Sequence, residues 1–277
     1  MRTLLLAAGL LALPALALAQ GTLTPPGAPA PSMKTLDQIE ARSPLQSGVP
    51  GVAQNANGGF TLLEPGSYYL TRNLSVASGT AIQIFADNVT LDLNGFTINS
   101  TASPANGSAI GIVNNQNIVI RNGHINGSIQ FDLVTGAPYG SGFKTGIVGP
   151  PTNELVCRVS DITIRGVLNS GIDLGAGGGS TVERCDVYGC SVGISAGFVS
   201  NSNARASVLN GIDAINVTNC FGSSRDANGC GIRAGGTATS CRATNSASGG
   251  IALGAQIAIG CTVDQGSILT VNRYLMP

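Results

Sequence analysis

Short runs of alternating apolar and polar residues begin at Phe60 and continue almost to the end of the chain. Residues 89–93 (VTLDL), 118–121 (IVIR) and 162–165 (ITIR) each place every second side chain on the same face. A period of two is typical of β-strands with one buried face. Glycine and asparagine, which adopt left-handed turn conformations at low cost, separate the runs. The pattern predicts an all-β protein made of short strands and tight turns.

A Gly-Ile pair recurs along the same region with a nearly constant step. The pairs end at Ile147, Ile172, Ile194, Ile212, Ile232 and Ile251, and Ile268 follows without the glycine. The steps are 25, 22, 18, 20, 19 and 17 residues, so the period is close to 20. Such a period indicates stacked repeats, and strands this short exclude leucine-rich and ankyrin units. We predict a parallel β-helix domain over residues 60–277, right-handed because parallel crossovers have that hand.

The first 19 residues have the features of a signal peptide. Arg2 precedes an apolar run over residues 4–18, and Ala17 and Ala19 form an A-x-A cleavage site. A membrane anchor is the alternative, but the run is short and Pro14 interrupts it. We expect export to the periplasm, cell surface or exterior, and no membrane span in the mature chain.

The residues between the signal peptide and the β-helix divide into two parts. Residues 20–31 contain four prolines among small residues, which is typical of an extended linker. In residues 32–59, the sequence TLDQ at 35–38 resembles a capping box, so we expect a short helix over 35–42, before Pro44. This helix, or the strands of residues 60–70, is expected to cover the first coil.

The charge composition excludes several partners and folds. Charged residues make up 10% of the chain, and 14 basic residues balance 14 acidic ones. This composition disfavours coiled coils and charged disordered chains, and it predicts no attraction to nucleic acid. Tryptophan is absent and aromatic residues make up only 4%, which is few for a sugar-binding module.

Two segments carry a resemblance to a known family. Residues 60–70 (FTLLEPGSYYL) and 88–96 (NVTLDLNGF) resemble the opening of bacterial right-handed parallel β-helix proteins of the pectin-lyase-like superfamily. The resemblance covers about residues 60–268. It implies an exported protein that binds, or cleaves as a lyase or glycoside hydrolase, an acidic polysaccharide. The alternative is a non-catalytic, adhesin-like or matrix scaffold, because one fold serves many functions.

The catalytic motifs of the polygalacturonase-like members are incomplete in this sequence. The only histidine, His124, stands in NGHI and lacks the second glycine of their G-H-G motif. No two aspartates are adjacent, so a paired-carboxylate hydrolase site has little support. We expect His124 to be a turn or surface residue.

The pectate-lyase-like members suggest a cationic site instead, with an Arg or Lys base beside calcium-binding carboxylates. If Asn88, Asn117 and Asp161 occupy equivalent positions, then Asp92, Arg121 and Arg165 point outward in one column, and Lys144 lies in an insertion that overhangs it. We therefore expect these four residues to form a substrate-binding site for an anion. Because calcium needs six to eight oxygen ligands, we expect no strong metal site and no other cofactor there; Asp92 either orients Arg121 or contributes one oxygen to a calcium ion. The alternative is an inter-coil salt bridge with one spare arginine.

Seven cysteines in an exported chain raise the question of disulfides. Cys220, Cys241 and Cys261 recur at steps of 21 and 20 residues, which is typical of small apolar side chains stacked in a repeat. Local pairs, Cys185 with Cys190 or Cys220 with Cys230, are the alternative. The chain has no C-x-x-C pair, so zinc is not expected.

Overall fold

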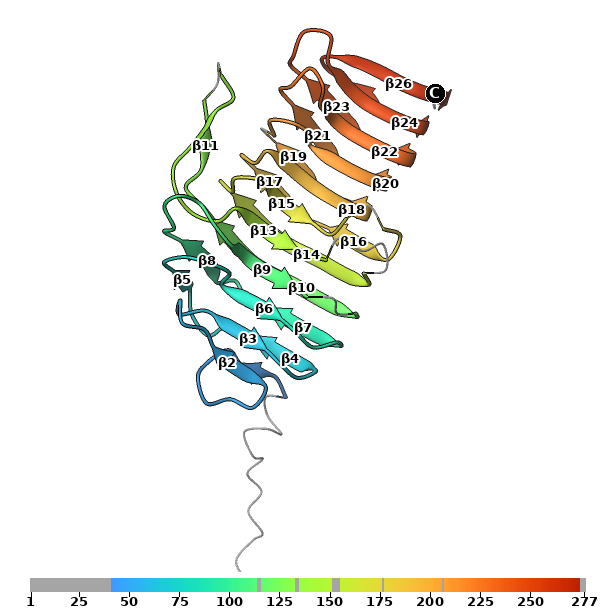
Figure 1. The fold of residues 1–277 in the computed structure, drawn as a ribbon. Helices are drawn as coiled ribbons and strands as arrows, with labels where there is room; N and C mark the ends of the chain where they lie inside the picture. Colours follow the sequence, from blue (N-terminus) through green and yellow to red (C-terminus); the bar gives the residue numbers. More distant parts are fainter. Residues whose placement is uncertain are drawn as a thin grey trace, which may run out of the picture. The chain divides into compact units, whose positions relative to one another are not determined.

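The structure, a computed structural model, describes residues 41–113, 116–132, 135–150, 155–175, 177–205 and 207–274, with side chains as far as residue 270. The expected signal peptide, the expected linker and all but the last two residues of the expected helix lie outside these ranges. Strands dominate the described part, and they stack as the coils of a parallel β-helix (Figure 1), which confirms the predicted fold. No helix in the described ranges is long and apolar enough to cross a membrane.

Each coil has three sides, which we call faces 1, 2 and 3, and most coils begin on face 1. Short strands on face 1 are β3 (Phe60–Leu62), β6 (Ile82–Ile84), β9 (Ser108–Ile112), β13 (Thr145–Val148) and β15 (Ser170–Asp173). Those on face 2 are β1 (Ser43–Pro44), β4 (Gly66–Tyr69), β7 (Val89–Asp92) and β16 (Ser180–Glu183). Those on face 3 are β5 (Leu74–Val76), β8 (Thr97–Ser100), β17 (Asp186–Tyr188), β19 (Asn203–Arg205), β21 (Phe221–Ser224), β23 (Arg242–Asn245) and β25 (Thr262–Val263).

Longer strands bend from one face to the next. Two run from face 2 to face 3, namely β10 (Ile118–Asn126) and β14 (Cys157–Arg165). Five run from face 1 to face 2, namely β18 (Val192–Ser200), β20 (Ile212–Thr218), β22 (Cys230–Thr239), β24 (Ile251–Ile259) and β26 (Ser267–Tyr274). The hairpin of β11 (Gln130–Phe131) and β12 (Pro138–Tyr139) forms a separate sheet, which extends away from the stacked coils (Figure 1).

The Gly-Ile period marks a buried column on face 1. The column consists of Phe60, Ile82, Ile110, Ile147, Ile172, Ile194, Ile212, Ile232, Leu253 and Ile268. Ile251 is not a member of the column, because it pairs with Cys230 and Leu253 pairs with Ile232. Leu253 is preceded by alanine rather than glycine, so the dipeptide pattern did not identify it.

The strands of residues 60–70, β3 and β4, form the first coil and do not cover it, so that prediction was wrong. Strand β2 (Val52–Gln54) pairs antiparallel with β3, and β1 pairs with β4. Both covering strands come from the segment before Phe60. They satisfy the backbone groups at an edge that would otherwise be open to aggregation.

All seven cysteines are buried and unpaired, so neither local disulfide is formed. Four of them directly follow a corner residue between faces 2 and 3, and they act as small side chains of the stack. These are Cys185, Cys220, Cys241 and Cys261.

The glycine that precedes an isoleucine of the face 1 column is required where neighbouring coils lie closest together. A Cβ atom on Gly211 would collide with the carbonyl oxygen of Gly231 and would lie 2.6 Å from the backbone nitrogen of Ser223. Both neighbours are backbone atoms of the ladder, so neither can move without disturbing the adjacent strands.

We therefore predict that Gly211→Ala destabilises the protein by about 1–3 kcal/mol, the usual cost of overpacking. Urea unfolding measures the change. Gly178→Ala is the matched control, because nothing lies within 4 Å of a Cβ there and Gly178 is exposed. Equal stability of the two variants would contradict the close backbone approach.

Candidate functional site

The corner between faces 2 and 3 determines where the predicted site residues lie. Its residues have positive φ angles of about 50–60° in successive coils, and they include Asn122, Asp161, Arg184, Asn201, Asn219 and Ser240. Left-handed backbone is unusual for arginine and serine, so the sequence does not mark these positions as turns. Each corner turns the chain without a loop.

The structure brings Asp92 and Arg121 together but separates both from Arg165. Arg121 pairs with Asp92 in the preceding coil and with Ser160 in the following one. Arg165 instead pairs with Asn126, beyond the corner. The single column was therefore a wrong prediction for Arg165. The reason is that Asp161 is equivalent to the corner residue Asn122, and not to Asn117.

Asp92 is a buried anchor for the first coils. Its Oδ2 accepts hydrogen bonds from Arg121 Nε at 3.2 Å and Arg42 Nη1 at 3.3 Å. Its Oδ1 accepts from Asn122 Nδ2 at 3.1 Å and from the backbone N–H of Asn94 at 2.8 Å. Asp92 is only 6% exposed. Both carboxylate oxygens are occupied within the fold, so Asp92 ties the first coils together, whereas the Arg121 side chain stays 47% exposed.

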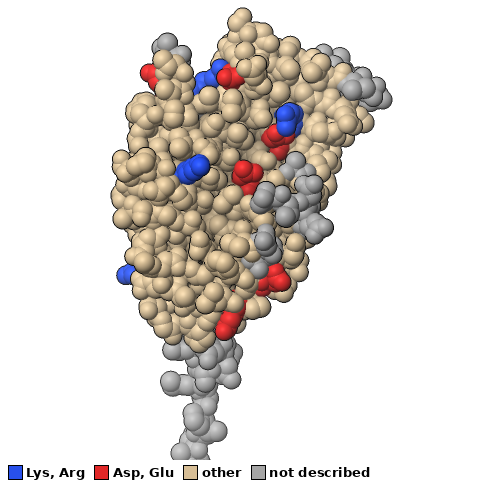
Figure 2. All heavy atoms as spheres, in the orientation of Figure 1, with Lys and Arg blue, Asp and Glu red and all other residues tan. Residues whose placement is uncertain are grey.

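Most other ion pairs also join neighbouring coils on the outer surface. They are Asp161 with Arg184, Asp186 with Arg205, Asp213 with Arg233, and Asp264 with Arg242. Arg184 donates hydrogen bonds to the Asp161 carboxylate, and these bonds lower the pKa of Asp161. Charged side chains are sparse on the surface in Figure 2. Most of the arginine charge is therefore neutralised within the fold.

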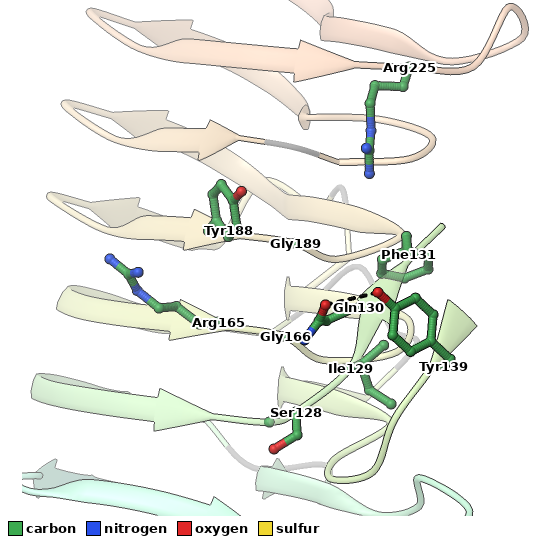
Figure 3. A pocket seen from close by; sticks show the side chains of 11 residues that line it. Ser128, Ile129, Gln130, Phe131, Tyr139, Arg165, Gly166, Tyr188, Gly189 and Arg225 are labelled. Atoms are coloured by element: carbon green, nitrogen blue, oxygen red, sulfur yellow. Dashed lines mark hydrogen bonds between the residues drawn. The ribbon is translucent and has the colours of Figure 1, made fainter. Parts of the chain in front are cut away.

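Arg165 has a different environment, a groove of about 480 Å³ between face 3 and the β11–β12 hairpin. Figure 3 shows the residues that line it: Gly127, Ser128, Ile129, Gln130, Phe131, Tyr139, Arg165, Gly166, Tyr188, Gly189 and Arg225. This volume lies within the usual range of small-ligand sites. We call it the hairpin groove.

The hairpin provides one wall of the groove. Gln130 pairs with Tyr139 across its two strands, and the Tyr139 hydroxyl donates a hydrogen bond to Gln130 Oε1 at 2.9 Å. At the base, Ser128 N–H donates to the carbonyl oxygen of Ser141, and Gly140 lies so close to Ser128 that a Cβ would collide with its carbonyl. These contacts fix the base of the wall.

Face 3 provides the opposite wall. Arg165 and Tyr188 are partners in adjacent coils, and Tyr188 is 49% exposed. Arg205 stands beside Tyr188 in the next coil, where it binds Asp186. Arg165 forms no ion pair with a described carboxylate. From a later coil, Arg225 directs its guanidinium toward the groove (Figure 3).

The two remaining candidate residues lie outside the groove lining. Lys144 is exposed just before β13, and its carbonyl oxygen accepts a hydrogen bond from Asn169 N–H. His124 is exposed on face 3, between Thr97 and Thr163 of the neighbouring coils, as expected for a surface residue.

Sequence reasoning missed Tyr139, Tyr188 and Arg225. One signal could have identified part of the wall: Arg165 and Tyr188 each end a strand of alternating residues and directly precede a glycine. Aligning the coils on the residue before this glycine, and not on Asn88, Asn117 and Asp161, would have placed Arg165 beside Tyr188.

The groove lining contains no Asp, Glu or His, and the described ranges contain no cluster of three such residues or cysteines placed to hold a metal ion. The available chemistry is guanidinium, phenol, hydroxyl and amide. No family model, curated protein or solved structure matches this chain.

The buried position of Asp92 generates a prediction about stability. We expect Asp92→Asn to destabilise the protein by about 1–3 kcal/mol, because the buried carboxylate accepts four hydrogen bonds that an amide cannot all replace. Asp186→Asn is the control. Its pair with Arg205 is half-exposed, so the loss should not exceed about 1 kcal/mol. Chemical denaturation of both variants measures the difference, and equal losses would show that Asp92 is not an anchor.

Proposed function

We propose that this protein is exported and binds an acidic polysaccharide in the hairpin groove. The observation that carries the proposal is the pairing of Arg165 and Tyr188 in adjacent coils, within the lining of a groove that Tyr139 of the hairpin also lines. Arg165 has no carboxylate partner among the described residues, while five other inter-coil sites neutralise their arginines. An external anion is the natural partner for this guanidinium.

The groove chemistry suits a sugar acid. The planar fork of arginine holds a carboxylate through two parallel hydrogen bonds. Tyr139 and Tyr188 are 56% and 49% exposed, and such rings offer flat apolar surfaces with a polar edge. Ser128 and Gln130 supply hydrogen-bonding groups for sugar hydroxyls.

The direction of the bound chain follows from the spacing of the coils. Arg165, Tyr188 and Arg205 come from three successive coils, about 4.8 Å apart. One sugar unit of an extended polymer has a similar length. We therefore propose that the polysaccharide lies along the helix axis, with neighbouring sugars on neighbouring coils.

The groove supports binding better than cleavage. A hydrolase site needs two carboxylates, and none lines the groove. A lyase site needs a base that removes the proton next to the sugar carboxylate, beside groups that stabilise the resulting negative charge. No cluster of three side chains placed to hold a calcium ion is found in the described ranges. The resemblance to pectin-lyase-like proteins supports a carbohydrate ligand. It does not distinguish binding from cleavage, so this distinction rests on the residues that line the groove.

We predict that the protein binds polygalacturonate, and that Arg165→Ala weakens this binding about tenfold or more. A hydrogen bond to a charged group contributes about 1.5–3 kcal/mol, which corresponds to at least that change. Isothermal titration calorimetry measures the affinity, and the melting temperature should stay unchanged because Arg165 is exposed. Binding should also weaken as the salt concentration rises.

Arg158→Ala is the matched control, because Arg158 is exposed on the same strand but on face 2. It should retain full affinity. Arg121→Ala should lower stability without lowering affinity. Equal loss of affinity in Arg158→Ala and Arg165→Ala would show that the polysaccharide does not bind specifically in the hairpin groove.

A structural scaffold is the second candidate function, and the inter-coil ion pairs favour it because they stabilise the rod without a ligand. A glycan array distinguishes the two. Binding to no anionic glycan, together with no release of an unsaturated product, would support the scaffold.

A further inference from the structure

Three thiols are stacked at one corner of the β-helix, away from the hairpin groove. Cys220, Cys241 and Cys261 occupy the same position in successive coils, directly after the left-handed residues Asn219 and Ser240 and after Gly260. Each sulfur lies within hydrogen-bonding distance of two carbonyl oxygens, the one two residues earlier and one in the preceding coil. The acceptors in the preceding coil are Val199, Val217 and Ala238. The thiols therefore point along the stack.

Cys241 and Cys261 are in direct contact. The backbone N–H of Cys241 donates to Sγ of Cys261 at 3.4 Å, and the Cys241 thiol can donate to the same sulfur in place of a carbonyl. The backbone is paired at the same place, since Thr262 N–H donates to the Cys241 carbonyl at 2.8 Å. Neighbouring coils are about 4.8 Å apart, which lies within the Cα separation of natural disulfides, about 4.4–6.8 Å.

We propose that Cys241 and Cys261 are a disulfide-forming pair, oxidised by exchange with a disulfide oxidant. The thiolate of Cys261 attacks one sulfur of the oxidant, and a mixed disulfide forms as the first thiolate leaves. Cys241 then attacks Sγ of Cys261 and releases the second thiolate. Two protein thiols are oxidised, one oxidant disulfide is reduced to two thiols, and the protein's two protons go to solvent or to the leaving thiolates.

Cys261 is the residue that reacts first. It is 8% exposed, whereas Cys241 is 2% exposed. The hydrogen bond from the Cys241 thiol lowers the pKa of Cys261, which favours its thiolate. Burial has the opposite effect elsewhere, and it raises the pKa of Cys157, Cys185 and Cys190 to about 12. Those three thiols remain protonated and unreactive at neutral pH.

The test uses the reduced full chain, incubated under native conditions with oxidised glutathione at pH 8. We expect the intact mass to fall by the mass of two hydrogens, and the free thiols to fall from seven to five. Peptide mapping should find Cys241 linked to Cys261. The melting temperature should rise by several degrees, because the crosslink constrains the unfolded chain.

Two substitutions separate the steps. In Cys241→Ser, the reaction should stop at a glutathione adduct on Cys261, and in Cys261→Ser neither adduct nor crosslink should form at this corner. Cys230→Ser is the matched control, because Cys230 is as exposed as Cys261 but does not belong to the stack of thiols at the corner. It should keep the crosslink.

The unmodified chain alone can overturn the proposal. Seven persistent thiols, a stable adduct on Cys261 without a crosslink, or a link from Cys241 to Cys220 would each do so. These readouts do not depend on whether a variant folds.

Discussion

The fold depends on one constraint: each coil must present the same backbone path to the coils on both sides. Hydrogen bonds between successive coils hold every face in register, so a residue's neighbours in space are its equivalents in the repeat. This explains the glycine at position 211, where the next coil leaves no room for a Cβ. It also explains the left-handed corner, which even Arg184 and Ser240 adopt. These residues adopt an unfavourable backbone conformation because a misplaced corner would break the hydrogen bonds to the coils on both sides.

Because the interior is fixed in this way, variation is confined to the outward positions and to the connections between faces. Most of the outward charged side chains form ion pairs between neighbouring coils. The buried carboxylate of Asp92 joins three segments of the first coils through its hydrogen bonds with Arg42, Arg121 and Asn122. The β11–β12 hairpin is the one connection among the described residues that builds a wall beside a face. Arg165 differs from the paired arginines because it lies beside this wall.

The sequence revealed the repeat and the face 1 column because glycine and a β-branched residue recur for a direct steric reason. It did not reveal the corner between faces 2 and 3, since Asn122, Asp161, Arg184 and Ser240 share a conformation and no chemical property. Placing Asp161 opposite Asn117 shifted Arg165 by five residues and onto the wrong face. The groove was missed for a related reason: its aromatic residues come from a hairpin and a strand that only the folded chain brings together.

The inward residues of face 2 become smaller along the stack. On face 2 they change from Leu91 and Ile120, through four valines, to Ala238 and Ala258. A buried isoleucine contributes about 1–2 kcal/mol more than alanine, so the later coils gain less from burial. Arg165 and Tyr188 extend from coils whose cores still contain the fully buried Ile164 and Val187. A binding wall needs such rigid support to hold a guanidinium and a ring in a fixed relation.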